Sequence, residues 1–246
     1  MSPVADSNLQ EYLSVAEKSS APSYTVRIRE WLGCLATAVQ YLHLNRIRHR
    51  DIKPANILVH GENVLLVDFE LALDWKDLAQ STTTANCGRT PLYAAPEVIQ
   101  HKKCNSTSDI WSLGCVFLEM VTVLKGKSIA QLREHFKART ESALFFNNYR
   151  SIQDWISLLE NMSHIDNAPL LWISTMVQPD RNLRSRADAI LDAIATFHAD
   201  GCWPNPYFGK CCQPKNQISK SQIRKCFRCT VDVSKVGNLI HSLSVS

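Results

Sequence analysis

The sequence predicts a mostly α-helical domain that carries one small β-hairpin. Three observations predict this fold class. Apolar residues recur three and four positions apart across residues 24–47, which is the spacing of one face of a helix. Two short β-rich runs follow, separated by a turn around Gly61. Beyond residue 105, several further stretches show the helical spacing again.

Length and composition fit one large soluble domain followed by a tail. The chain has 246 residues, 45% of them hydrophobic, and a net charge of +4 from 27 basic and 23 acidic residues. This charge is too small and too dispersed to indicate a specific nucleic-acid partner. We expect no transmembrane segment, because even the apolar residues 110–124 include Glu119. The N-terminus has acidic residues (Asp6, Glu11) where a secretory signal would be basic and then apolar, so we expect a cytoplasmic or nuclear protein.

The first half of the chain is predicted to hold one long helix and the hairpin. The helix spans residues 24–47 and needs a core to lie against, because its apolar face is formed by Ile28, Trp31, Leu32, Leu35, Val39 and Leu42. The hairpin pairs residues 57–59 with residues 64–67, and Gly61 suits the tight turn between them. Residues 75–91 hold many Thr, Ser and Asn residues, so we predict a long loop there, of the length that is usually functional.

The second half is predicted to be helical as far as residue 198. Ser106 or Ser108 is expected to cap a helix that ends before Gly126. Further amphipathic helices are expected near residues 129–139, 152–162, 169–177 and 185–198. The composition then changes to Gly, Pro, Cys and Lys. We therefore predict a domain over residues 1–198 and a partly disordered tail over residues 199–246.

Three short motifs that carry chemistry occur in a fixed order. Residues 49–56 read His-Arg-Asp-Ile-Lys-Pro-Ala-Asn, residues 68–70 after the hairpin read Asp-Phe-Glu, and residues 95–97 after the loop read Ala-Pro-Glu. With the strands between them, these motifs resemble the protein kinase family over about residues 1–198. The resemblance implies a protein kinase-like fold, in which a mostly helical large lobe presents its catalytic hairpin to a small β-rich lobe.

The resemblance implies a role for each motif residue. Asp51 resembles the catalytic carboxylate that orients the attacking hydroxyl, and Lys53 resembles the group that neutralises the transferring phosphate. Asn56 and Asp68 resemble the ligands of magnesium, one on each side of the hairpin. Thr90 resembles the threonine that bonds to the catalytic aspartate and lysine. The implied cofactors are ATP and Mg²⁺. The implied substrate is a protein serine or threonine, because a lysine at position 53 is similar to the serine/threonine branch.

Three further matches concern regulation and stability. Arg50 resembles the arginine that pairs with a phosphorylated activation loop, and residues 81–84 (Ser-Thr-Thr-Thr) lie where such a phosphate can be attached. Asp109 resembles the helix-capping aspartate that braces the catalytic loop. Arg184 resembles the partner of Glu97, and a buried pair of this kind is costly to break on one side only.

The N-terminal residues resemble the hinge between the two kinase lobes. Val4, Ala5 and Asp6 are therefore expected to contact ATP, and the chain is expected to begin in the middle of the domain. The eight glycines form no Gly-x-Gly-x-x-Gly run, so we expect the small lobe to be missing from this chain. The face that normally meets it would be exposed or covered by a partner.

Glu70 departs from the family pattern, which has glycine after the Asp-Phe pair. A glutamate adds bulk and negative charge beside the implied magnesium site. It could supply an extra metal ligand or misplace Asp68, and the conformational freedom of glycine favours the second interpretation.

Two functions stay open at this point. The chain is either a serine/threonine kinase whose activity is impaired in isolation, or a non-catalytic kinase-like binding module (a pseudokinase) or truncated gene product. The tail also leaves two alternatives. Four thiolates can hold zinc, but adjacent cysteines and a single Cys-x-x-Cys pair favour unligated thiols; the cysteines concerned are Cys202, Cys211, Cys212, Cys226 and Cys229.

Overall fold

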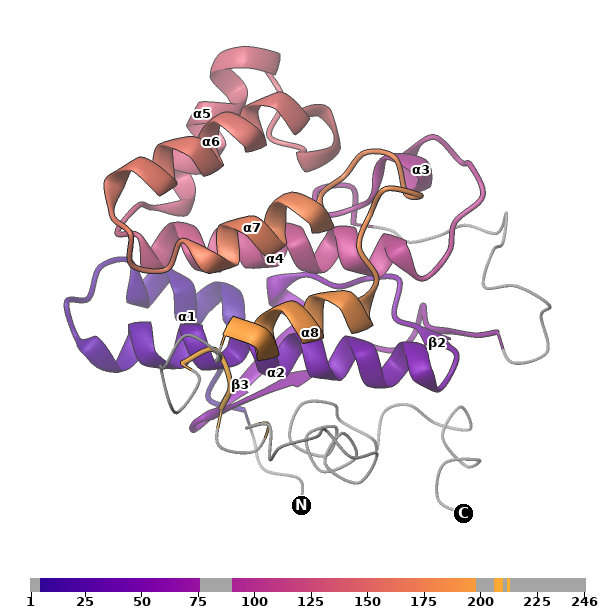
Figure 1. Cartoon of the computed structure of the whole chain (residues 1–246), viewed down its shortest axis with the longest axis horizontal. Helices are drawn as coiled ribbons and strands as arrows, with labels where there is room; N and C mark the ends of the chain where they lie inside the picture. Colours follow the sequence, from indigo (N-terminus) through magenta and orange to yellow (C-terminus); the bar gives the residue numbers. More distant parts are fainter. Residues whose placement is uncertain (1–4, 76–89, 198–205, 210–211, 213–246) are drawn as a thin grey trace.

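The structure is a computed structural model that describes residues 5–75, 90–197, 206–209 and 212. The helices lie in layers, with α2 and α8 below, α4 and α7 across the middle, and α5 and α6 above (Figure 1). Along the chain, the elements are β1 (Ser7–Asn8), α1 (Leu9–Ala16), α2 (Pro22–Leu44), β2 (Ile47–Arg48), η1 (Pro54–Asn56), β3 (Ile57–His60), β4 (Asn63–Leu66), β5 (Leu73–Asp74), α3 (Pro96–Ile99), α4 (Thr107–Leu124), α5 (Ile129–Thr140), η2 (Phe145–Asn147), α6 (Tyr149–Met162), α7 (Ala168–Met176) and α8 (Ala187–Thr196).

Helix α2 is followed by the short strand β2, after which residues 49–53 lead into η1. It begins with Pro22, whose fixed φ and missing N–H suit the first turn of a helix. It ends at Leu44, because Arg46 adopts a left-handed φ of 59° that a helix cannot continue through. Ile47 therefore lies in β2, which pairs with β5. The predicted helix over residues 24–47 is right in type, but it begins two residues too late and ends three residues too late.

The predicted hairpin is confirmed. β3 and β4 pair antiparallel from Ile57 opposite Leu66 to His60 opposite Asn63, which leaves a two-residue turn. Gly61 occupies that turn with a φ of 57°, where a residue without a Cβ has no steric penalty. The two-residue strand β1 adds to the other edge of β3, and the sequence predicted no strand there.

Helix α4 runs through the centre of the core. By length and composition its 18 residues could cross a membrane, but 83% of this stretch is buried inside the fold, as in the core helix of a globular domain. It ends before Gly126, as predicted. Ser106 holds the predicted cap position, but its side chain makes no cap hydrogen bond. Instead the Oδ1 atom of Asn105 accepts a 3.0 Å hydrogen bond from the Thr107 N–H.

Part of the predicted tail belongs to the core. Tyr207 and Phe208 are 3% and 1% exposed, and Cys212 is also buried. They form the short orange segment beside α2, near the end of α8 (Figure 1). The division at residue 198 stays a prediction, since most of residues 199–246 lie outside the described residues.

Candidate active site

The loop between β2 and β3 is held by one carboxylate. Asp109, in the first turn of α4, accepts hydrogen bonds from the backbone N–H groups of His49 (3.0 Å) and Arg50 (2.9 Å). The His43 ring contacts the same carboxylate at 2.9 Å. Burial raises the pKa of Asp109, but these bonds outweigh it and hold the pKa below its usual range. The bracing role implied for Asp109 is therefore matched by its contacts.

His49 joins this loop to the segment after β4. Its ring is fully buried, and its Nε2 atom lies 2.9 Å from the Val67 carbonyl oxygen. The ring also packs against Phe69 with centroids 4.8 Å apart. Burial lowers the pKa of His49 against the opposing charge of Asp109, so the neutral ring donates to Val67. This geometry makes His49 a structural residue.

Four of the predicted catalytic residues meet at one point. Asp51 Oδ1 accepts a hydrogen bond from Thr90 Oγ1 (2.7 Å), and Asp51 Oδ2 accepts from Lys53 Nζ (2.6 Å) and Asn56 Nδ2 (3.1 Å). Lys53 Nζ also donates to Thr90 Oγ1 at 2.9 Å. Asp51 is 8% exposed, so its charge is stabilised by these donors more than by water. The predicted catalytic set of Asp51, Lys53, Asn56 and Thr90 is thus brought together.

The two predicted magnesium ligands lie at the same end of the hairpin. The Val67 N–H donates to the Asn56 carbonyl oxygen at 3.0 Å, which places the following residue, Asp68, beside Asn56. The Asn56 amide nitrogen donates to Asp51, so its Oδ1 atom is the free acceptor of that amide. An amide oxygen and a carboxylate are oxygen donors of the kind that Mg²⁺ binds together with phosphate oxygens. The residues fit magnesium, and their ligand role stays a prediction.

Glu70 is accommodated without the conformation that would require glycine. The positive φ in this segment falls on Asp68, at 65°, and Glu70 is not among the residues of positive φ. Its side chain is exposed. The backbone argument for a displaced Asp68 therefore finds no support in this geometry, whereas the added negative charge remains.

The predicted hinge residues lie at the hairpin. Asp6 donates its N–H to the Val59 carbonyl oxygen (2.9 Å), and its carboxylate accepts from the Gly61 N–H (2.7 Å). Ala5 precedes it, and Val4 lies outside the described residues. The contact of these residues with ATP stays a prediction.

The Arg50 side chain is partly buried and feels the charge of Asp109. Its Nε atom is buried and has no hydrogen-bond partner in the described part of the chain. Burial lowers the pKa of Arg50, as expected of a cation with few anionic neighbours. The Ser-Thr-Thr-Thr run proposed to face it, residues 81–84, lies outside the described residues.

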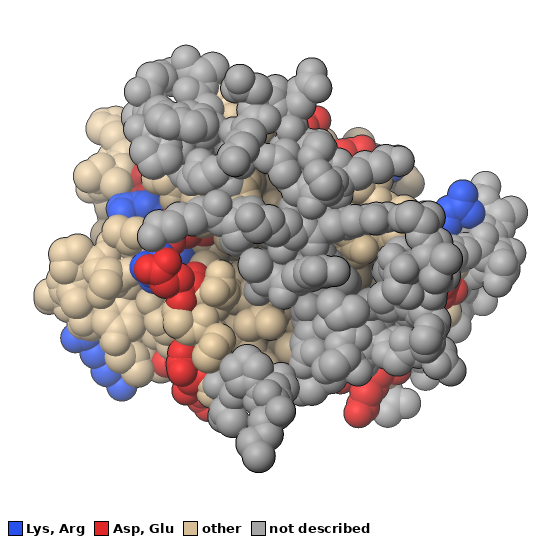
Figure 2. Space-filling view, turned by 90° about the horizontal axis from the view of Figure 1, so that it is seen from below, with Lys and Arg blue, Asp and Glu red and all other residues tan. Residues whose placement is uncertain are grey.

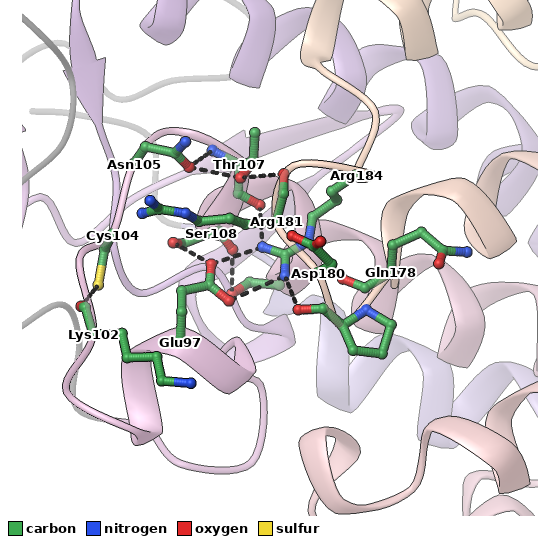
Figure 3. A network of polar contacts seen from close by, with 12 residues as sticks. Glu97, Lys102, Cys104, Asn105, Thr107, Ser108, Gln178, Asp180, Arg181 and Arg184 are labelled. Carbon is green, nitrogen blue, oxygen red and sulfur yellow. Dashed lines mark hydrogen bonds and ion pairs between the residues drawn. The ribbon is translucent and has the colours of Figure 1, made fainter.

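The predicted pair of Glu97 and Arg184 is formed in the interior. The guanidinium donates to both carboxylate oxygens, at 2.8 Å and 3.1 Å, and also to the Thr107 carbonyl oxygen at 2.9 Å (Figure 3). Ser108 donates a further bond to the carboxylate at 2.9 Å. Burial raises the pKa of Glu97, but the bond and charge of Arg184 outweigh it, so the pKa is lowered. The pair joins α3 to the loop before α8.

A second buried ionic cluster, which was not predicted from the sequence, is formed by Tyr93, Glu119 and Arg133. The Tyr93 hydroxyl donates to both carboxylate oxygens of Glu119 (3.0 and 3.1 Å), and Arg133 pairs with the same carboxylate. Arg133 also lies over the Phe145 ring, 4.5 Å from its centroid. Burial raises the pKa of Glu119 to about 7 despite the charge of Arg133. The one available signal was an acidic residue inside an apolar helix.

Two further features of the described residues are the mixed charge of the surface and the lack of a cluster of His, Cys, Asp and Glu side chains. Basic and acidic side chains lie next to each other on the described part of the face in Figure 2. The described residues contain no cluster of three or more His, Cys, Asp or Glu side chains able to hold a metal. Cys212 is the one cysteine of the predicted zinc set among them.

Comparison with known proteins adds the following. Residues 1–194 match the family description "Protein kinase domain". Serine/threonine-protein kinase nekl-2 of Caenorhabditis elegans is 29% identical over 203 residues, which are 80% of this chain and 50% of that protein. Serine/threonine-protein kinase Nek3 of Oryza sativa subsp. japonica is 45% identical over 100 residues (40% and 16%). Mitogen-activated protein kinase kinase kinase 2 of Arabidopsis thaliana is 39% identical over 110 residues (44% and 17%). The chain thus aligns with half or less of the length of these curated relatives.

Proposed function

Because this chain belongs to the protein kinase family, we propose that it supplies the large-lobe part of a site that transfers a phosphoryl group from ATP to a protein serine or threonine. The observation that carries the proposal is the meeting of Asp51, Lys53 and Thr90 within hydrogen-bond distance. Thr90 lies 39 positions from Asp51 along the chain, so the fold brings these side chains together and sequence proximity does not.

Asp51 is the proposed acceptor of the proton of the substrate hydroxyl. Its carboxylate is positioned to orient a substrate hydroxyl and to accept its proton as the new P–O bond forms. Lys53 holds the Oδ2 atom and places a positive charge next to the reacting oxygen. Thr90 holds the Oδ1 atom, so the carboxylate plane cannot rotate freely. Together, Asp51, Lys53 and Thr90 fix the orientation of the carboxylate and the charge next to the reacting oxygen.

Asn56 and Asp68 are proposed to hold the metal. ATP with Mg²⁺ supplies the phosphoryl group and screens its negative charge when bound. The chain contributes an amide oxygen whose direction is fixed by the bonds from Asn56 to Asp51. Asp68 contributes a carboxylate on a backbone of positive φ.

The ATP phosphates also need a glycine-rich loop that packs over them. No Gly-x-Gly-x-x-Gly run occurs in these 246 residues. We propose that the site works together with a small lobe, supplied by the same polypeptide or by a partner on the exposed face. Without it, positioning and charge clamping are incomplete, and these are most of the catalysis in this reaction class. A cytoplasmic or nuclear location is proposed from the N-terminal sequence alone.

A non-catalytic, kinase-like binding module is the second candidate. The exposed negative charge of Glu70 beside Asp68 favours it, because this charge alters the affinity of the site for a phosphate-bound metal. In this case the contacts of Asp51 with Lys53 and Thr90 would serve to hold the loop in shape.

Acceptor specificity tests the proposed function. The chain is fused behind the small lobe of a related kinase and incubated with magnesium-ATP and two peptide pools, one with serine and threonine acceptors and one with tyrosine acceptors. We expect phosphate in the serine/threonine pool alone. Labelling of the tyrosine pool alone would overturn the substrate class. A folded fusion that binds ATP but labels neither pool would favour the binding module.

A further inference from the structure

A short C-terminal segment packs into a groove formed by residues of α2 and α7 and by residues that follow α6 and α8. Tyr207 and Phe208 are almost completely buried there, against α2, α7 and α8. The segment follows the last residue of the kinase family match by more than ten positions. Its burial is therefore a feature of this chain that the family match does not cover.

Gly33 makes room for the segment in the middle of α2. A glycine inside a helix is unfavourable relative to alanine, so its presence needs a reason. The Gly33 N–H donates a 2.8 Å hydrogen bond to the Tyr207 carbonyl oxygen. A Cβ at this position would lie 2.2 Å from that oxygen and 2.5 Å from Phe208 Cδ1. Any side chain at position 33 would expel the segment.

The Tyr207 hydroxyl contacts a buried carboxylate at the polar end of the groove. It donates a 3.2 Å hydrogen bond to Asp166 Oδ1, in a buried position. Asp166 is fixed from the other side by Arg29, which donates to both carboxylate oxygens at 2.7 and 2.8 Å. The groove thus contains an oriented acceptor for a phenolic hydroxyl.

Aromatic rings enclose the body of the same side chain. The Tyr207 ring meets the rings of Trp172 and Phe197 edge to face, with centroids 5.1 and 5.2 Å apart. Trp172 and Phe197 also touch each other, at 6.4 Å. This arrangement matches the preferred geometry of aromatic groups and selects a ring over an aliphatic chain.

The segment then turns and returns to α2. Cys212 donates its N–H to the Gly209 carbonyl oxygen at 2.9 Å, and its Sγ atom lies 3.5 Å from that of Cys34. Among the described residues, the segment forms neither helix nor strand; it contacts the lobe through the Gly33–Tyr207 backbone hydrogen bond, the Tyr207–Asp166 hydroxyl bond and side-chain packing. Such a segment can leave while the helices stay folded, because local openings of this kind cost less than global unfolding.

We propose that the groove lined by Gly33, Asp166, Trp172 and Phe197 is a docking site for a Tyr-Phe peptide segment. Its occupant is the segment of this chain formed by residues 206–209, which acts as a strap across the lobe. Recognition rests on three features: a backbone acceptor for Gly33, a hydroxyl for Asp166, and an aromatic ring between Trp172 and Phe197. The site is separate from the catalytic cluster and does not depend on the proposed phosphoryl transfer.

The test empties the groove in the full chain and refills it with a peptide. The variant Tyr207→Ala with Phe208→Ala removes the occupant but keeps every groove residue. The probe is a peptide with the sequence of residues 204–210, Pro-Asn-Pro-Tyr-Phe-Gly-Lys. We expect it to bind the emptied chain at least about tenfold more tightly than a peptide with alanine in place of tyrosine, and not to bind the unmodified chain. A folded, emptied chain that does not distinguish the two peptides would overturn the proposal.

A second substitution shows where the peptide binds. Gly33→Ala added to the emptied chain should abolish binding, because the new Cβ fills the place of the tyrosine carbonyl. Gln40→Ala, two turns further along α2, should leave binding unchanged. Equal binding with and without Gly33→Ala would place the peptide elsewhere and overturn the proposed groove.

A single conservative substitution gives a test that does not require the double alanine variant to fold. Tyr207→Phe removes only the hydroxyl bond to Asp166. Hydrogen exchange at the Gly33 amide should become about two- to tenfold faster, while exchange in α6 stays unchanged. Unchanged exchange at Gly33 would mean that the hydroxyl does not hold the strap, and would overturn the proposal.

Discussion

Thr90 and Asp51 are joined by a 2.7 Å hydrogen bond from the threonine hydroxyl to Oδ1 of the carboxylate. The same hydroxyl oxygen accepts a bond from Lys53 at 2.9 Å. The bond ties Thr90 to the Asp51 carboxylate across 39 positions of the chain. A displacement of Thr90 would therefore also change the orientation of Asp51.

The Thr90 hydroxyl should be needed for phosphoryl transfer. Thr90→Val keeps the shape of the side chain but cannot donate to Asp51. In the small-lobe fusion, we expect kcat to fall about 10- to 100-fold, the loss expected for one hydrogen bond to a charged group. Thr90→Ser, which keeps the hydroxyl, should retain most of the activity. A valine variant as active as wild type would show that this bond has no catalytic role.

The buried pair of Glu97 and Arg184 should dominate the ionic contribution to stability. Glu97→Gln leaves a buried guanidinium without its counter-charge, and we expect the free energy of unfolding in urea to fall by about 3–5 kcal/mol. The matched control is Asp154→Asn, in an exposed pair with Arg139, where the loss should be under about 1 kcal/mol. Equal losses in the two variants would contradict the burial argument.

Glu119 should make the stability of the lobe depend on pH. Burial raises its folded pKa to about 7, above the ordinary 4.5, so between these values the folded state holds a proton that the unfolded state has lost. The contribution of this group to the free energy of unfolding is therefore largest below pH 4.5 and declines as the pH rises to 7. The total decline is up to about 3 kcal/mol, and above pH 7 there is no further change. Glu119→Gln should lack this decline. Urea midpoints between pH 5 and 8 compare the two, and parallel curves would contradict the raised pKa.

The isolated chain should bind magnesium-ATP weakly. The metal ligands Asn56 and Asp68 are present, but the chain contains no glycine-rich cover for the phosphates. Calorimetric titration should give a Kd well above the low micromolar range, that is, a binding free energy weaker than about −8 kcal/mol. Asp68→Asn should weaken the binding further. Glu70→Gln, which removes a negative charge at the same turn, should strengthen it or leave it unchanged. Low-micromolar binding by the isolated chain would contradict the half-site account.

The local part of the site could be predicted from sequence, because its geometry is set by a short loop. Asp51, Lys53 and Asn56 lie within six residues, and the hairpin that follows has a clear turn signal at Gly61. The pairing of Glu97 with Arg184 followed from the family resemblance. The loop and the hairpin are local in sequence, whereas the Glu97–Arg184 pair joins residues 87 positions apart and was reached through the resemblance alone.

Long-range polar contacts could not be predicted in the same way. The sequence predicts no role for His43, since its contact with Asp109 joins residues 66 positions apart. The end of α2 was missed because Arg46, not glycine, adopts the positive φ there. The burial of Tyr207 and Phe208 was missed because a two-residue aromatic pair among Pro and Gly has no periodicity. Tertiary packing decides all three.

Phosphate transfer by the small-lobe fusion and by its Asp51→Ala variant tests the central claim most directly. Radiolabelled ATP, magnesium and a serine/threonine peptide pool are supplied, and Asp154→Ala serves as a surface control. We predict incorporation by the fusion and by Asp154→Ala, none by Asp51→Ala, and none by the 246-residue chain without a small lobe. Incorporation that survives Asp51→Ala, or transfer by the isolated chain that is lost on Asp51→Ala, would contradict the account.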